Sequence, residues 1–298
     1  MAHDYLIRAI LGGGRARLFV LRTTATVGEA QARHGTTPLA TAALGRTLTA
    51  GLVLGAMLKG EESVTVQIKG DGPLGGIVAS ANSRGSVKGY VGNPLVDLPL
   101  DSAGKLAVGE AVGKGNLHVI RDLGLKEPYA GTVPLQTGEI GDDFAYYFTY
   151  SEQVPSAVML GVLIGTDLVP LGSGGIVVQL LPDAVNDDAF ITALEDSIAK
   201  MPAISSLFAA QLSPEEIAAQ VFAGLELSII DKMDVAFNCE CSKERFERAL
   251  ITLGRQELEQ FVRAAEPLET ICHFCSKRYF FNVGHLEQLL RELGNPRE

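Results

Sequence analysis

The placement of the cysteines constrains this chain more than any other feature of its sequence. All four cysteines among the 298 residues fall in two short motifs, Cys239-Glu240-Cys241 and Cys272-His273-Phe274-Cys275. Two closely spaced thiol pairs brought together form a tetrahedral four-sulfur site, the geometry that zinc prefers. We therefore predict one Zn²⁺ per chain, bound by Cys239, Cys241, Cys272 and Cys275.

A closed shell of four thiolates leaves no position for a substrate or an activated water, so we expect no enzyme activity at this site. His273 is interpreted as a flanking residue, because four thiols already suffice. A structural zinc would stabilise a small domain. A redox switch is the alternative, because thiolates are the form that oxidants attack. A thiol-disulfide oxidoreductase with Cys272 or Cys275 as nucleophile is a third reading, although no βαβ pattern surrounds them.

The disulfide pairing of an oxidised form is left open by the spacing, since four thiols allow three connectivities. Pairing within each motif would close only very short loops. Such bonds would not tie the two motifs together as a shared metal ion does.

Charge and hydropathy exclude several other classes of protein. The chain has 25 Lys and Arg against 35 Asp and Glu, a net charge of −10, which argues against nucleic-acid binding. The start Met1-Ala2-His3-Asp4-Tyr5 lacks the pattern of a signal peptide, so we expect a cytoplasmic protein in a reducing compartment. The apolar stretch from Pro38 to Leu58 contains Arg46 and several Thr and Gly residues. Because of these residues, we interpret the stretch as a helix buried in the protein and expect no membrane association.

Residues 1–181 are predicted to form an α+β domain that mixes a sheet with helices, because strands and helices do not alternate strictly. A long helical pattern runs from Thr36 to Lys59 and ends at Gly60. The predicted strands are Tyr5–Leu11, Ala16–Thr23, Ser63–Lys69, Gly76–Asn82, Ser86–Val91, Ala145–Tyr150 and Gly175–Leu181.

Residues 182–230 are predicted to be a helical linker. Asn186 is a candidate N-cap for a helix through Met201, and Ser213-Pro214-Glu215-Glu216 is a capping box with proline at the first helical position.

Residues 231–298 are predicted to form the zinc-binding domain. Its expected elements are a helix from Ser242 to Gly254, a short helix at Gln256–Arg263, a β-like pair around Cys272–Val283 and a final helix at Leu286–Leu293.

Three further patterns have simpler explanations than chemistry. Gly70-Asp71-Gly72-Pro73-Leu74-Gly75 has the spacing of a dinucleotide-binding loop, but a strand-like run follows it, so we predict a hairpin turn. His118 has no partner specified by spacing and is interpreted as structural. The carboxylates within Gly138–Asp143 are expected to cap the following element in a solvated turn.

A further set of segments, together with the cysteine motifs, forms a distinctive combination: Gly45-Arg46-Thr47, Lys69–Gly75, Gly89-Tyr90-Val91, Asn93-Pro94, Val119–Gly124, Gly138–Asp143, Tyr146-Tyr147, Ser151–Ser156, Cys239–Phe246 and the pair Cys272 and Cys275. Taken together, these segments resemble the heat-shock-protein-33 family, the redox-regulated holdase chaperones, over nearly the whole chain. Glu240 stands where the family often has Asp, and since it is not a ligand the change is of little consequence.

The resemblance implies an N-terminal domain, a helical linker and a redox-switch domain whose four cysteines hold zinc in the reduced, inactive state. It implies that oxidative stress forms the Cys239–Cys241 and Cys272–Cys275 disulfides. Zinc loss, unfolding of switch and linker, homodimerisation and binding of unfolding client proteins would follow. The net charge of −10 would help to keep the exposed form soluble.

Overall fold

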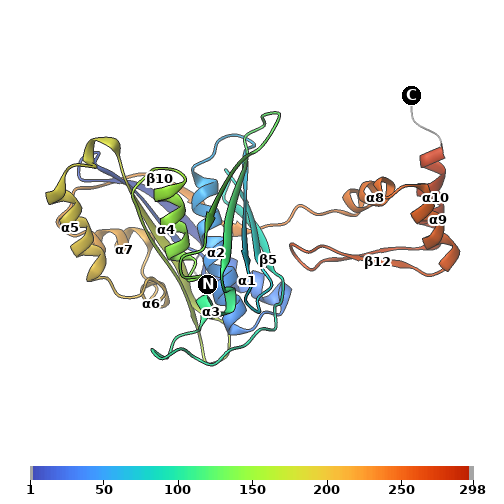
Figure 1. The fold of residues 1–298 in the computed structure, drawn as a ribbon, viewed down its shortest axis with the longest axis horizontal. Coiled ribbons are helices and arrows are strands. Elements are labelled where there is room, and N and C mark those ends of the chain that lie inside the picture. The colour runs from blue at the N-terminus through green and yellow to red at the C-terminus, as the bar shows by residue number, and fades with distance from the viewer. Residues whose placement is uncertain (1–2, 295–298) are drawn as a thin grey trace. The chain divides into compact units, whose positions relative to one another are not determined.

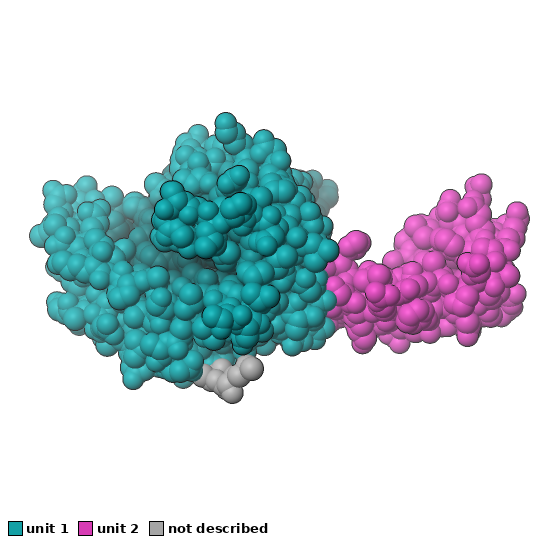
Figure 2. Space-filling view, turned by 90° about the horizontal axis from the view of Figure 1, so that it is seen from below, with its two compact units in different colours: residues 1–238 teal, residues 239–298 magenta. Residues whose placement is uncertain are grey.

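The computed structural model describes residues 3–294. The chain divides into two compact units, residues 1–238 and residues 239–298, which Figure 2 shows in two colours. The fold class is α+β, as the sequence predicts, and the bounds of the elements follow for each unit in turn.

Two antiparallel hairpins build the first sheet of unit 1, here called sheet A. Within the described residues its strand order is β10-β1-β2-β9-β8. Gly12, Gly13 and Gly14 all have positive φ in the turn between the first two strands, a conformation that favours glycine. The strands are β1 (Tyr5–Leu11), β2 (Ala16–Arg22), β8 (Ser156–Ile164), β9 (Pro170–Leu180) and β10 (Leu227–Asp234).

The predicted meander forms the centre of the second sheet, sheet B, whose order within the described residues is β11-β5-β4-β3-β6-β7. All its neighbouring strands are antiparallel except β11, which runs parallel to β5. The strands are β3 (Ser63–Gly70), β4 (Ile77–Asn82), β5 (Ser86–Val91), β6 (Gly115–Asp122), β7 (Tyr129–Pro134) and β11 (Ala236–Phe237).

Helix α2 (Pro38–Ala56), labelled in Figure 1, packs against strands of both sheets. Its residues are buried on nearly every side. It is long and apolar enough to cross a membrane, but 94% of the relevant window is buried inside the protein. A Cβ atom at Gly55 would lie 2.6 Å from the carbonyl oxygen of Asn82, so glycine lets the helix approach sheet B closely. The expectation of a buried core helix is confirmed.

The opposite face of sheet A is covered by α5 (Asp188–Ala199), α6 (Ile204–Ala209) and α7 (Pro214–Val221), which follow a short 3₁₀ turn at Pro182–Ala184. The capping box is confirmed, since Ser213 Oγ accepts from Glu216 N at 3.2 Å and Glu216 Oε2 accepts from Ser213 N at 2.8 Å. The N-cap of α5 is Asp187 and not Asn186, because the Asp187 carboxylate accepts from Phe190 N at 3.1 Å.

The layer between these helices and sheet A is a continuous apolar core. Side chains from β1, β2 and β9 meet side chains from all three helices. Its buried members include Ile7, Ala9, Leu11, Leu18, Val20, Ile176, Val178, Phe190, Leu194, Ile204, Phe208, Ile217, Val221 and Phe222.

One predicted strand is wrong: Ala145–Tyr150 belongs to helix α4 (Gly141–Tyr150). The buried carboxylate of Asp143 accepts from the backbone N–H groups of Gln136, Thr137 and Gly138 through Oδ1 and from Ile140 through Oδ2. These bonds fix the turn that starts the helix. Capping by this acidic cluster is therefore confirmed, but Asp143 is 0% exposed, so its environment is not solvated.

Helices α1 (Thr24–His34) and α3 (Val108–Val112) complete unit 1. The expected start of the zinc-binding domain, Asp231, lies inside β10, which pairs with β1 along its length. Because these backbone bonds belong to sheet A, the compact second unit begins eight residues later, at Cys239.

Candidate metal centre

Unit 2 has a small core around which the four cysteines are arranged. Its elements are α8 (Lys243–Thr252), α9 (Arg255–Ala264), β12 (Leu268–Ile271), β13 (Arg278–Phe281) and α10 (Val283–Gly294). Its buried core residues include Leu250, Leu258, Tyr279, Phe281, Leu286 and Leu289, with Cys241 and Phe246 packed against them.

Cys239 and Cys241 lie on the extended segment that leads into α8. Ser242 ends this segment as the helix N-cap, and its hydroxyl oxygen accepts from Arg245 N at 3.3 Å. The predicted helix start is confirmed. The cap fixes the direction of the chain immediately after Cys241.

Cys272 and Cys275 lie in the turn of the β12–β13 hairpin. Cys272 N donates to Lys277 O at 2.9 Å, and Ser276 N donates to Cys272 O at 2.8 Å. Ser276 adopts a positive φ of 57° to complete this turn. No helix begins at Cys272 in this described segment, so the local structure does not match a thioredoxin-like dithiol.

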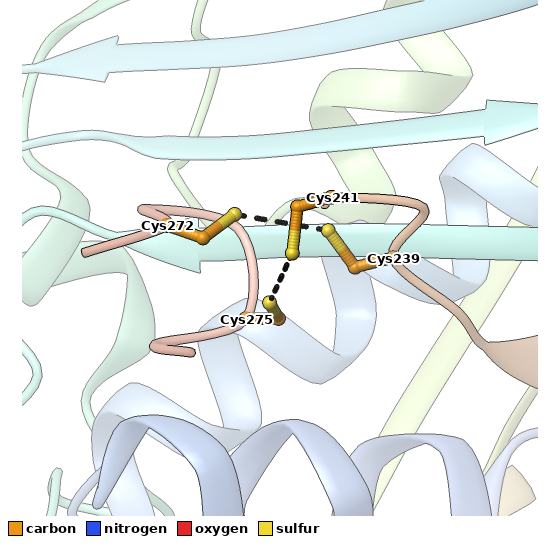
Figure 3. Close-up of side chains that lie close together, drawn as sticks. All are labelled: Cys239, Cys241, Cys272 and Cys275. Carbon is orange, nitrogen blue, oxygen red and sulfur yellow. Dashed lines mark hydrogen bonds between the residues drawn. The ribbon is translucent and has the colours of Figure 1, made fainter. Parts of the chain in front are cut away.

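The fold brings the four sulfur atoms together, with all four Sγ atoms within 4.8 Å of one another. The segment with Cys239 and Cys241 is called the first arm, and the turn with Cys272 and Cys275 the second arm. Figure 3 shows the cysteine side chains of the two arms pointing toward a common centre. Cys239 Sγ lies 3.8 Å from Cys272 Sγ, and Cys241 Sγ lies 3.4 Å from Cys275 Sγ. All four are free thiols. Neighbouring sulfurs in a tetrahedron with Zn–S bonds of about 2.3 Å are about 3.8 Å apart, so the arrangement fits a four-sulfur metal site.

The electrostatic environment of the four thiols is unequal. Burial raises the pKa of Cys239 to about 12, and burial also raises the pKa of Cys272. Burial acts in the same direction on Cys241, but hydrogen bonds from Tyr279 and from the other three thiols outweigh it and lower the pKa of Cys241 to about 7. The cluster thus combines one thiol whose pKa is lowered with two whose pKa is raised by burial.

Tyr279 is part of this site and was not predicted from the sequence. Its hydroxyl donates toward Cys241 O at 2.8 Å and lies 3.1 Å from Cys241 Sγ. Burial, followed by these contacts with Cys241, raises the pKa of the Tyr279 phenol. The sequence offers one hint, the aromatic run Tyr279-Phe280-Phe281, which has strand propensity. In the structure the burial of β13 alternates and places Tyr279 on the inward face.

Comparison with known proteins places the whole chain in one family. The family model described as "Hsp33 protein" matches residues 4–282. The chain belongs to the Hsp33 family.

Curated relatives of this Hsp33 chain are similar along their full length. The 33 kDa chaperonin of Desulforamulus reducens is 46% identical over 290 residues, covering 97% of this chain and 98% of that protein. The 33 kDa chaperonin of Bacillus subtilis is 48% identical over 287 residues, covering 96% and 98%. The crystal structure of the 33 kDa chaperonin from Thermotoga maritima superposes with a TM-score of 0.90 at 35% identity, covering 97% of this chain and 98% of that one.

The remaining sequence motifs of this Hsp33 protein serve the fold. Gly70–Gly75 connects β3 to β4, which confirms the predicted turn. His118 lies on β6 with its Nδ1 2.9 Å from Thr132 Oγ1, and burial, with the nearby charge of Lys69, lowers its pKa. In the described chain the group of side chains able to hold a metal ion consists of the four cysteines, and His273 is not one of its members.

Proposed function

We propose that this protein is a redox-regulated holdase chaperone that is inactive while its four cysteines hold Zn²⁺ and active once they are oxidised. Membership of the Hsp33 family and the chaperonin names of its relatives support a chaperone rather than an enzyme. The single observation that carries the redox part is the convergence of every cysteine in the chain on one centre. The proposal includes a cytoplasmic location, unfolding client proteins and a second copy of the chain as partners, and neither nucleic acid nor membrane.

The donor set determines which metal and which chemistry suit the site. Four sulfurs from Cys239, Cys241, Cys272 and Cys275 favour zinc among the common cellular ions. When bound, Zn²⁺ would keep all four thiols deprotonated and join the two arms. The protein supplies the positions of the sulfurs, through the Ser242 cap on one arm and the hairpin turn on the other.

Oxidation converts all four thiolate ligands to disulfides, which no longer bind the metal ion. Four thiolates and two molecules of hydrogen peroxide, with four protons from solvent, give two disulfides and four molecules of water. We propose that the bonds are Cys239–Cys241 and Cys272–Cys275. The nearest sulfurs in the reduced structure belong to different arms, Cys239 with Cys272 and Cys241 with Cys275, so disulfide mapping by mass spectrometry is the direct test of the pairing.

The switch is proposed to act on clients through the helices that cover sheet A. Helices α5, α6 and α7 bury an apolar face against β1, β2 and β9. Release of these helices would uncover that face together with their own apolar sides, and contiguous exposed apolar surface binds non-native chains without sequence specificity. Strand β10 and the short β11 connect this region to Cys239 along the chain, so unfolding that begins at the cysteines can propagate into it.

The test is a light-scattering assay with an aggregating client, run on the reduced protein and on protein treated with peroxide under mildly unfolding conditions. Zinc and free thiols are counted in both samples. We expect one zinc and four thiols to change to none of either, with aggregation suppressed only after oxidation. Glu240→Gln, which alters the first motif without removing a sulfur, should behave like the parent. Zinc release without a gain in suppression would contradict the proposal.

A further inference from the structure

The phenol of Tyr279 makes a direct contact between the two cysteine motifs. It projects from β13, on the second arm, and its hydroxyl lies 2.8 Å from Cys241 O and 3.1 Å from Cys241 Sγ, on the first arm. Its ring packs against Phe246 of α8 with 4.9 Å between the ring centroids, and the residue is only 7% exposed. The packing of the ring thus holds the hydroxyl in place.

A hydroxyl carries one proton, so this proton is shared between the carbonyl oxygen and the sulfur of the same residue. The contact to oxygen fixes the backbone at Cys241, and the contact to sulfur engages a sulfur lone pair. Residues that hydrogen-bond to metal ligands orient them and tune their basicity, and losing such a partner typically lowers metal affinity about 10–100-fold.

We propose that Tyr279 is a positioning residue for the cysteine cluster: its hydroxyl holds Cys241 in the metal-binding arrangement and shields that sulfur from oxidants. This inference rests on the metal site of the proposed function. The shielded step is attack of the Cys241 thiolate on hydrogen peroxide. In that step an S–O bond forms, the O–O bond breaks and hydroxide leaves, after which a second thiolate displaces another hydroxide to form the disulfide. A sulfur lone pair engaged by a hydrogen bond is a weaker nucleophile in this step.

Tyr279→Phe removes the hydroxyl and leaves the ring that packs on Phe246. In the full-length protein we expect metal affinity, measured by competition with a chromophoric chelator, to fall about 10-fold. With Co²⁺ in place of Zn²⁺, the sulfur-to-metal charge-transfer absorption should shift, because one of the four donors has lost a hydrogen bond. Peroxide should consume the thiols of the metal-loaded variant severalfold faster. The matched control is Tyr150→Phe, which removes a hydroxyl from a residue 67% exposed in unit 1 and should change none of these values.

Parent-like affinity, spectrum and oxidation rate in Tyr279→Phe would overturn the inference. Lower affinity with an unchanged Co²⁺ spectrum and an unchanged oxidation rate would also overturn it, because loosening of the fold alone would produce that result. If the parent protein bound no metal, the proposed function would fail separately. The cysteine cluster would then form without metal, and amide hydrogen exchange at residues 239–242 would test the contact by itself. Faster exchange in Tyr279→Phe would support a hydroxyl that joins the two arms, and unchanged exchange would overturn it.

Discussion

The two units of this chain are stabilised by cores of very different depth. In unit 1, sheet A is covered on both faces, by α2 on one side and by α5, α6 and α7 on the other. In unit 2, one small cluster of side chains from three helices and a two-stranded hairpin must hold the fold. Small domains bury too little apolar surface to be stable on that basis alone and usually add a cross-link. The four converging cysteines of unit 2 supply the positions for one.

The largest expected effect is the loss of unit 2 when a cysteine is removed. Cys272→Ser, or exhaustive metal chelation of the parent, should abolish the fold of residues 243–294, because structural zinc contributes about 10–16 kcal/mol of apparent folding energy to small modules. Hydrogen exchange read by mass spectrometry should show loss of protection in α8, α9 and α10. Glu240→Gln serves as the control. Full protection of these helices without metal would show that the small core suffices and would break the contrast between the units.

A buried aromatic residue in unit 1 tests the other side of the contrast. Phe208 of α6 is 1% exposed, and its ring occupies the space where a Cβ atom at Gly174 would lie, 2.1 Å away. Phe208→Ala should lower the free energy of unfolding of unit 1 by about 3–5 kcal/mol in urea titrations, with unit 2 unaffected. Leu168→Ala, at a side chain that is 59% exposed, should stay within about 0.5 kcal/mol of the parent. A similar small loss for both variants would mean that α6 contributes little to the core.

The smallest expected effect concerns the polar contacts that hold α7 beside sheet A. Tyr5 OH donates to Glu215 Oε2 at 2.6 Å, Lys232 Nζ lies 3.5 Å from Glu215 Oε1, and the same Nζ lies 3.6 Å from the Tyr5 ring centroid. Glu215→Gln should cost about 0.5 kcal/mol, as is usual for partly exposed pairs, and should speed hydrogen exchange in α7. The control is Asp196→Asn, because the ion pair of Asp196 with Lys200 is more exposed than the pair of Glu215 with Lys232.

The same contacts give the effect a pH dependence with a definite sign. Burial opposes the charged form of Glu215, but the hydrogen bond from Tyr5 and the charge of Lys232 outweigh it and lower the pKa of Glu215. A carboxylate whose pKa is lowered by folding adds stability above its ordinary pKa and loses it as the pH falls below that value. The difference between parent and Glu215→Gln should therefore vanish in acid. If Glu215→Gln were still less stable than the parent in acid, the loss of stability would come from packing and not from the charge of Glu215.

Local signals account for most of what the sequence predicted. Ser213 and Ser242 are followed by residues that complete a helix cap, and both helices start where expected. The four cysteines are recognisable because their spacing alone restricts them to a few roles, and the fold does bring them together. Signals of this kind depend on neighbours in the chain, so one sequence contains them in full.

What the sequence missed depends on contacts between distant residues. The aromatic-rich run Ala145–Tyr150 has strand propensity, but the buried Asp143 cap and the burial of Phe144, Tyr147 and Phe148 on one side make it helical. Helix α1 was not predicted, because its apolar stripe is short and only Thr26, Val27 and Ala30 are buried. The bond from Tyr279 to Cys241 spans 38 residues, and no spacing rule identifies such a pair.

Helix α2 has a consequence for the synthesis of the protein. Its partners on sheet B follow it closely in the chain, but its partners on sheet A, β8 and β9, end only at Leu180. At the usual 5–20 residues per second, the ribosome needs on the order of ten seconds to make the residues between Ala56 and Leu180. Throughout that interval a helix apolar enough to enter a lipid bilayer has only part of its cover. The nascent chain of this chaperonin-family protein is thus, for some seconds, the kind of substrate that chaperones bind.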